Sequence, residues 1–138
     1  MARKVFVDTS FLVAVLDHRD RWHERAMELT SDLDEHRAEM ITTDAVLLEM
    51  ANYFSRSPLR QHAIEWISAI REAGGWNVIE LKRTLLARAE FRYSRHPDKS
   101  WSLTDCISME VMEMRRMREA ATTDVHFSQA GYSVLMRE

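Results

Sequence analysis

Two acidic residues directly follow predicted strands, where carboxylates can converge on a metal ion. Asp8 comes after the β-branched and aromatic run Lys4–Val7, and Asp124 comes after the short predicted strand Ala120–Thr123. Because the carboxyl ends of parallel strands meet at one edge of a sheet, both carboxylates are expected on the same rim. Converging carboxylates repel one another, and such hard-oxygen sites suit Mg²⁺ or Mn²⁺ and the phosphates that these ions carry.

Two further acids are expected beside this rim. Asp105 lies in the first turn of a predicted helix over residues 105–118, whose mostly apolar circumference indicates burial and whose dipole favours a negative charge there. Glu49 lies at the margin of an apolar helical face, beside Val46 and Tyr53, with no Lys or Arg three or four residues away. A carboxylate at a core margin is costly without a partner, and a metal ion would supply the missing charge.

Each acid taken alone also has an ordinary structural interpretation. Asp8 can cap the helix that follows it, and the helix N-terminus alone explains an acid at Asp105. Glu49 can be a solvated or ion-paired edge residue, and Asp124 can be a turn residue. Their joint placement is what favours a site.

Strands and helices alternate along the chain, which predicts a three-layer α/β/α fold with a mostly parallel sheet of four to five strands in a single domain, 1–138. The expected strands are Lys4–Val7, Met40–Thr42, Trp76–Leu81, Ala120–Thr123 and Tyr132–Leu135. The expected helices are Phe11–Leu16, Arg21–Ala38, Ala45–Ser55, Arg60–Glu72, Lys82–Arg95, Asp105–Arg118 (capped by Thr104) and a turn at Phe127–Ala130.

The composition excludes several classes of protein. With 138 residues, 3 Gly and 2 Pro, the chain is one domain long and has little material for the turns of an all-β sandwich. The lone Cys106 cannot form an internal disulfide, and the longest apolar run, Phe11–Leu16, is too short to span a membrane. An intracellular, cytoplasmic protein is therefore expected. The net charge of −3 gives no global attraction to nucleic acid.

A locally basic segment precedes Asp105. Between residues 82 and 99 there are six cations and two acids, a local net charge of +4. Its candidate RNA contacts are Arg88, Arg92, Arg95 and Lys99. Tyr93 and Trp101 could stack on unpaired bases, or could pack in the core as aromatic residues at such spacing more often do.

The segments that carry the four acids also suggest a family. They are Val5–Ser10, Thr43–Asn52, Ser102–Cys106 and Thr122–Phe127, followed by Ala130–Tyr132. In order and spacing they resemble the segments of the PIN domain family, above all its small VapC-type ribonuclease toxins. The resemblance implies an acidic pocket of Asp8, Glu49, Asp105 and Asp124, of which Asp8, Asp105 and Asp124 are the metal ligands. It also implies Mg²⁺- or Mn²⁺-dependent hydrolysis of RNA. In-line attack by a water activated by such an ion is expected to leave a 5′ phosphate and a 3′ hydroxyl.

The resemblance further implies supporting hydroxyls, at Ser10, Thr104 and Thr123, although strand or capping roles are the alternative for the two threonines. The chain departs from some relatives at His126, where they carry a further acid. We expect an ordinary packing or surface role for this histidine, with a phosphate contact as the alternative. A small antitoxin protein and a homodimer are implied as partners. The alternative function is a catalytically silent PIN-like module that binds protein or RNA.

Overall fold

The five strands form one parallel sheet, which confirms the expected fold class. A computed structural model describes residues 3–137, and its strand order is β3-β2-β1-β4-β5. The strands are β1 Lys4–Val7, β2 Glu39–Thr43, β3 Trp76–Ile79, β4 Glu119–Ala121 and β5 Ser133–Val134. In the register, Phe6 of the central strand β1 lies between Ile41 of β2 and Ala120 of β4. The carboxyl ends of β1 and β4 are therefore neighbours.

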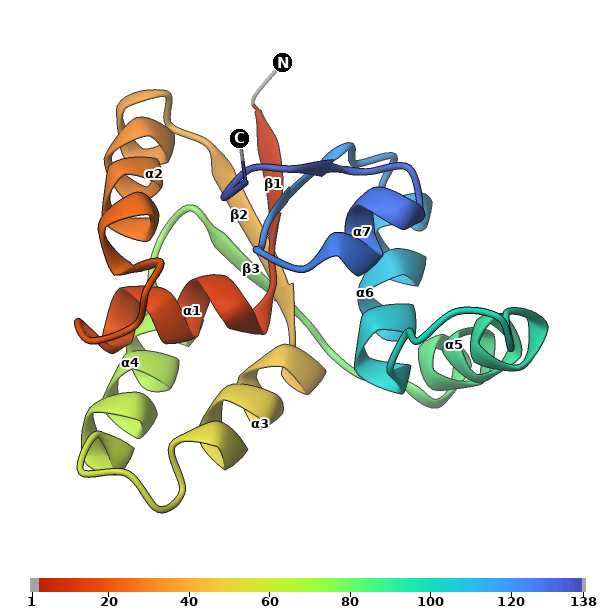
Figure 1. Cartoon of the computed structure of the whole chain (residues 1–138), viewed down its shortest axis with the longest axis horizontal. Coiled ribbons are helices and arrows are strands. Elements are labelled where there is room, and N and C mark those ends of the chain that lie inside the picture. The colour runs from red at the N-terminus through yellow and green to blue at the C-terminus, as the bar shows by residue number, and fades with distance from the viewer. Residues whose placement is uncertain (1–2, 138) are drawn as a thin grey trace.

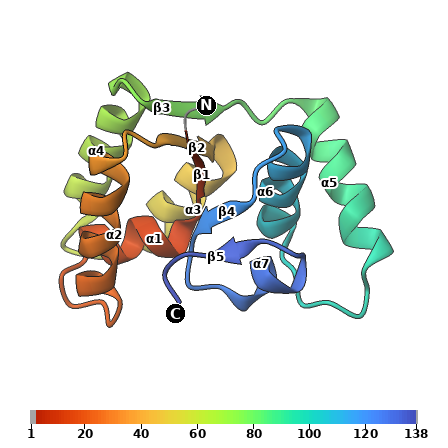
Figure 2. The ribbon, with the colours of Figure 1, turned by 90° about the horizontal axis from the view of Figure 1, so that it is seen from above.

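Seven helices surround the sheet in the described part of the chain. They are α1 Thr9–Leu16, α2 His23–Glu35, α3 Asp44–Tyr53, α4 Arg60–Glu72, α5 Arg83–Arg95, α6 Leu103–Met114 and α7 Val125–Gln129. Figures 1 and 2 show α1, α2 and α4 on one side of the sheet and α5, α6 and α7 on the other. Helix α3 contacts both α1 and α6, and so links the two sides. Among residues 3–137, no helix is long and apolar enough to cross a bilayer.

The start and end of α6 differ from the expectation. Ser102, not Thr104, is the N-cap: its hydroxyl accepts a hydrogen bond from the Asp105 amide, and the Asp105 carboxylate accepts one from the Ser102 amide. This reciprocal capping box satisfies two amides that the first helical turn would otherwise leave free. The helix ends at Met114 rather than Arg118, and Arg116 takes the left-handed conformation with φ of 54°.

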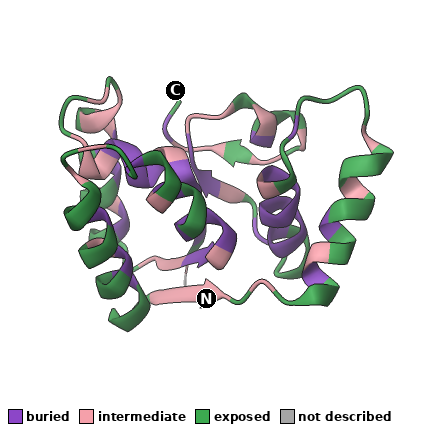
Figure 3. Ribbon diagram, turned by 90° about the horizontal axis from the view of Figure 1, so that it is seen from below, coloured by how far each residue is buried: buried purple, intermediate pink, exposed green. Residues whose placement is uncertain are grey.

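The core explains why the strand ends are held firmly. Val5, Phe6 and Val7 of β1 are fully buried, as expected for a central strand of a parallel sheet covered on both faces. Figure 3 shows α1 and α6 largely buried and the outer helices α4 and α5 largely exposed. Phe127 of α7 stacks on Phe6 at 6.4 Å between ring centroids. The segments that carry the acids are thus anchored to one core.

Candidate active site

The four predicted acids line one cavity at the carboxyl ends of the strands. The cavity has a volume of about 440 Å³, and its lining includes Asp8, Glu49, Asp105 and Asp124. Asp8 and Asp124 follow the neighbouring strands β1 and β4, Asp105 lies in the first turn of α6, and Glu49 lies on α3. Residues separated by up to 116 positions in the sequence therefore meet at one rim of the sheet.

Asp8 is a buried carboxylate whose side chain does not cap the following helix. It is only 5% exposed, and α1 has no capping hydrogen bond from the Asp8 side chain. Its Oδ2 instead accepts hydrogen bonds from the hydroxyls of Thr122, at 2.7 Å, and Ser10, at 3.4 Å. Burial raises the pKa of Asp8 to about 7, and the charges of Asp105 and Asp124 add to this, while the Thr122 hydrogen bond opposes it.

Thr122 is a central residue of the site that the sequence interpretation passed over in favour of Thr123. The fully buried Thr122 hydroxyl contacts the Ser10 hydroxyl at 3.0 Å and accepts a hydrogen bond from the Asp124 amide at 3.0 Å. Thr123 participates through its backbone amide, which donates to the Ser10 hydroxyl at 3.0 Å. Thr123 also lines the cavity.

Asp105 combines a structural and a site contact. It is 7% exposed, and its Oδ2 accepts the Ser102 amide of the capping box at 3.0 Å. The same oxygen lies 2.9 Å from Nδ1 of His126. The contact with Ser102 belongs to the cap of α6, and the contact with His126 belongs to the acidic cavity.

Asp124 and His126 line the cavity next to Asp105. Asp124 is the N-cap of α7, and its Oδ1 accepts a hydrogen bond from the His126 amide at 2.9 Å. The imidazole Nδ1 lies 3.2 Å from that oxygen. One ligand atom each from Asp105, Asp124 and His126 lies within 4.8 Å of the others. The structure therefore gives His126 a place in the acidic cluster rather than the ordinary packing or surface role expected from the sequence.

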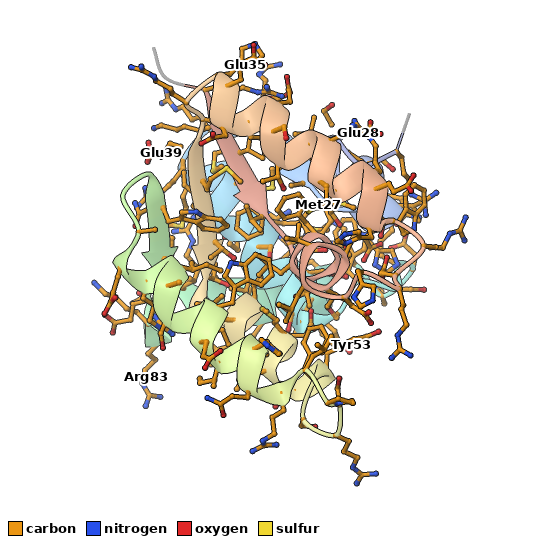
Figure 4. The ribbon with its side chains drawn as sticks, turned by 90° about the vertical axis from the view of Figure 1, so that its left-hand side faces the viewer. Met27, Glu28, Glu35, Glu39, Tyr53 and Arg83 are labelled. Carbon is orange, nitrogen blue, oxygen red and sulfur yellow. The ribbon has the colours of Figure 1, made fainter. Side chains whose placement is uncertain are left out.

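Glu49 lies at the outer edge of the cavity. Its side chain is exposed, and its Oε1 accepts a hydrogen bond from the Thr9 hydroxyl at 2.5 Å. Nothing in the sequence pattern predicted this contact. Tyr53, which was expected in the buried face of the same helix, is 61% exposed and also lines the cavity. Figure 4 is viewed along the axis of α1 and shows the Tyr53 side chain next to α1.

The charges of the cavity suit a divalent cation. Among the ion pairs of residues 3–137, no Lys or Arg is paired with Asp8, Glu49, Asp105 or Asp124, and the only basic partner of these acids is His126. Buried carboxylates without compensation are costly, and carboxylate oxygens with one imidazole are ligands that divalent metal ions accept. The residues present therefore fit such an ion.

Three arginines of the basic segment have ionic or aromatic partners within the fold. Arg92, whose side chain is 16% exposed, donates to Glu110 at 2.6 Å and is also paired with Glu113. Arg88 pairs with Glu110 at 3.2 Å, and the guanidinium of Arg95 lies over the ring of Phe91. Glu110 and Glu113 belong to α6 and are distant in sequence, so counting charges along residues 82–99 overstates the positive charge of this surface.

Other cations lie beside the cavity. Trp22 lines it, and the guanidinium carbons of Arg21 and Arg137 lie 5.0 Å and 5.7 Å from the centre of the Trp22 ring. On another side, a neighbouring hollow of about 600 Å³ is lined by Tyr93 and Lys99 among others, and it shares Ser100 and Ser102 with the acidic cavity. Thr104, a predicted supporting residue, lines neither hollow.

The protein is thus a parallel α/β protein with an acidic site beyond the carboxyl ends of its strands, which is where open sheets of this kind bind their ligands. The sequence model of the PIN domain matches residues 5–131, and the chain belongs to that family. No curated protein matches the chain in sequence.

Solved structures resemble the whole chain. VapC20 of Mycobacterium tuberculosis, described as a sarcin-ricin loop cleaving toxin, is 27% identical with a TM-score of 0.83, over 93% of this chain and 95% of that one. The fold is shared with FitAcB from Neisseria gonorrhoeae, at 12% identity and a TM-score of 0.64, over 95% and 96% of the two chains. The fold is also shared with VapBC2 from Rickettsia felis, which was solved bound to a DNA fragment from its promoter. That chain is 9% identical with a TM-score of 0.69, over 95% of this chain and 96% of that one. The family match and the likeness to VapC20 support a family of nucleases from toxin-antitoxin systems.

Proposed function

We propose that this protein is a metal-dependent endoribonuclease and the toxin of a toxin-antitoxin pair. The observation that carries the proposal is the convergence of four carboxylates on one cavity, with no Lys or Arg paired to them among residues 3–137. The family membership and the likeness to VapC20 support the choice of RNA as the substrate.

The proposed metal ligands are Asp8, Asp105 and Asp124. A bound Mg²⁺ or Mn²⁺ supplies positive charge for the scissile phosphate and lowers the pKa of water for in-line attack. Glu49 is exposed at the cavity edge and fixed by Thr9, so it is placed to orient the attacking water or to accept its proton. The acids otherwise act by holding charge at fixed positions.

The supporting residues keep the carboxylates in place. The hydroxyls of Ser10 and Thr122 hold Oδ2 of Asp8, and the Thr122 hydroxyl also fixes the backbone of Asp124. Thr123 contributes its backbone amide to Ser10. Thr104 has no place in the proposed machinery, because it does not line the cavity and is not the helix cap.

We place the RNA strand across the cavity from the Trp22 rim toward the hollow that holds Lys99. An acidic cavity repels RNA, so cations beside it must bind the phosphates. Arg21 and Arg137 are exposed near the Trp22 ring, and Lys99 lies in the hollow next to the shared Ser100. Arg92 is excluded from this path by its pairing with α6.

Binding measurements test this path. The double variant Arg21→Gln/Arg137→Gln is expected to bind an RNA oligonucleotide more weakly in the absence of metal ions. The slope of log Kd against log salt concentration should fall by the amount that corresponds to about two phosphate contacts. The matched control is Arg56→Gln, which removes an exposed arginine that does not line the cavity. An unchanged Kd in the double variant would refute this placement of the strand.

A protein partner is proposed for the surface of α3 and α4. Leu48 and Tyr53 of α3 are each 61% exposed, and Ile64 of α4 is 51% exposed, which leaves apolar side chains in solvent beside the cavity. Exposed apolar surface rimmed by polar residues is typical of interaction sites. We propose an antitoxin there, as well as a homodimer in solution.

RNA cleavage by the purified protein tests the proposed function. Structured and unstructured RNAs are incubated with Mg²⁺, Mn²⁺ or a chelator, and a hairpin with the sarcin-ricin loop sequence is included because VapC20 is described as cleaving that loop. The Asp8→Asn variant is expected to be folded and inactive. The control Asp34→Asn makes the same change on the exposed face of α2 and is expected to cleave normally.

The outcomes separate the two candidate functions. Metal-dependent cleavage by the wild type and Asp34→Asn, but not by Asp8→Asn, would support the nuclease. A wild type that binds no divalent ion and cuts no RNA would refute it and leave a binding module.

A further inference from the structure

His126 occupies a position in the acidic cluster that ordinary packing does not explain. Its side chain is 24% exposed, and its Nδ1 lies between two carboxylate oxygens, 2.9 Å from Oδ2 of Asp105 and 3.2 Å from Oδ1 of Asp124. The backbone of His126 is fixed as well, because its amide donates to Oδ1 of Asp124 at 2.9 Å. Three ligand atoms, from α6, from the start of α7 and from α7 itself, therefore lie close together.

The spacing of these atoms matches the ligand shell of a small divalent cation. In an octahedral shell with bonds of about 2.1 Å, adjacent ligand atoms are about 3.0 Å apart. The two distances from Nδ1 fall on either side of this value. One ligand atom from each of the three residues also lies within 4.8 Å of those from the other two.

We propose that His126 is a nitrogen ligand of the metal ion and that it makes the site select Mn²⁺ over Mg²⁺. This inference rests on the proposed metal-dependent function and names the ion that the site prefers. Mg²⁺ strongly favours oxygen ligands, whereas imidazole is a ligand of transition-metal ions. An all-carboxylate site would lack this preference.

The neutral imidazole can bind an ion in either of two tautomers. A nitrogen ligand needs a free lone pair, so a ring that binds through Nδ1 would carry its single hydrogen on Nε2. Nδ1 lies at hydrogen-bond distance, 2.9 Å, from Oδ2 of Asp105, and that oxygen also accepts a hydrogen bond from the Ser102 amide.

Metal binding in the absence of RNA tests the inference without relying on activity. Pulsed EPR of the Mn²⁺-loaded protein, with and without isotope-labelled histidine, reports whether a histidine nitrogen is bound to the ion. Calorimetry gives the Kd values for Mn²⁺ and Mg²⁺. The test variant is His126→Asp, which keeps a ligand but removes the nitrogen, and the control His62→Asp makes the same change on the exposed face of α4. Thermal melting verifies that both variants fold.

We expect a histidine nitrogen coupling in the wild type and in His62→Asp but not in His126→Asp. A partner that only orients a metal ligand is worth about 10-fold to 100-fold in metal affinity, and the imidazole nitrogen favours Mn²⁺ over Mg²⁺. The ratio of Mn²⁺ to Mg²⁺ affinity is therefore expected to fall about tenfold or more in His126→Asp. Mn²⁺ binding without nitrogen coupling, or an unchanged affinity ratio, would overturn this inference and leave the nuclease proposal standing. Binding of neither ion would overturn both.

Discussion

Replacing Asp8 by Asn is expected to stabilise the metal-free protein at neutral and alkaline pH. Asn keeps the shape of the side chain and an oxygen that accepts the Thr122 hydrogen bond, but it carries no charge to bury. The raised pKa of Asp8 means that the folded state binds its proton more tightly than the unfolded chain does. The wild type therefore loses stability as the pH rises from the unfolded pKa to the folded pKa.

The size of the effect follows from the two pKa values. The pKa of Asp8 rises from 3.8 to about 7 on folding, and each unit corresponds to about 1.4 kcal/mol. The unfolding free energy of Asp8→Asn should exceed that of the wild type by up to about 4 kcal/mol at pH 8, and by well under 1 kcal/mol near pH 4. The change is large against a total of about 5–15 kcal/mol for a typical domain.

Urea unfolding in a chelating buffer at several values between pH 4 and pH 8 measures this difference. The advantage of Asp8→Asn should grow between pH 4 and 7 and then level off, while the exposed control Asp34→Asn should show no such trend. Added Mn²⁺ should stabilise the wild type and not Asp8→Asn. An advantage that is independent of pH, or a less stable Asp8→Asn at pH 8, would refute the argument that burial dominates the pKa of this carboxyl.

Three further predictions concern the supports of the site and the surfaces around it. Thr122→Val removes a buried hydroxyl with three hydrogen-bond contacts, so the free energy of unfolding should fall by about 1–3 kcal/mol. The rate of RNA cleavage should fall at least about tenfold. The control Thr30→Val removes an exposed hydroxyl and should change neither quantity appreciably. Arg92→Ala should lower the urea-unfolding free energy by about 1–3 kcal/mol because the largely buried Glu110 carboxylate keeps only the exposed Arg88 as a partner, whereas Arg88→Ala, at 62% side-chain exposure, should cost less than about 1 kcal/mol. Leu48→Arg should keep RNA cleavage and change stability by less than about 0.5 kcal/mol, yet lose copurification with the antitoxin; retained copurification would contradict the partner surface on α3.

The order of the elements was predictable from the sequence because the chain follows simple local rules. The strand Lys4–Val7 and the helix Arg60–Glu72 have the predicted bounds, since a β-branched run and an apolar stripe at helical spacing are strong signals. The start of α6 was predicted wrongly. Thr104 and Ser102 are both good caps, and only the reciprocal contact of Ser102 with Asp105 decides between them.

The site was predictable in its acids and less so in their partners. The position of Asp8 and Asp124 after strands places them on one rim by topology alone. The partners depend on three-dimensional packing: which of two adjacent threonines faces the buried carboxylate, and which glutamates of α6 neutralise Arg88 and Arg92. His126 was underestimated because one histidine in a sequence shows nothing of its distance from two carboxylates.

The chemistry of the cleaved ends tests the central claim most directly. If the carboxylates hold a cation that activates water, each cut leaves a 5′ phosphate and a 3′ hydroxyl, and an RNA blocked by a methyl group on the 2′ oxygen at the cleavage site is still cut. Mass spectrometry of the products distinguishes the alternatives. A 2′,3′-cyclic phosphate with a 5′ hydroxyl, or complete protection by the 2′ methyl group, would show attack by the ribose itself and would contradict the account.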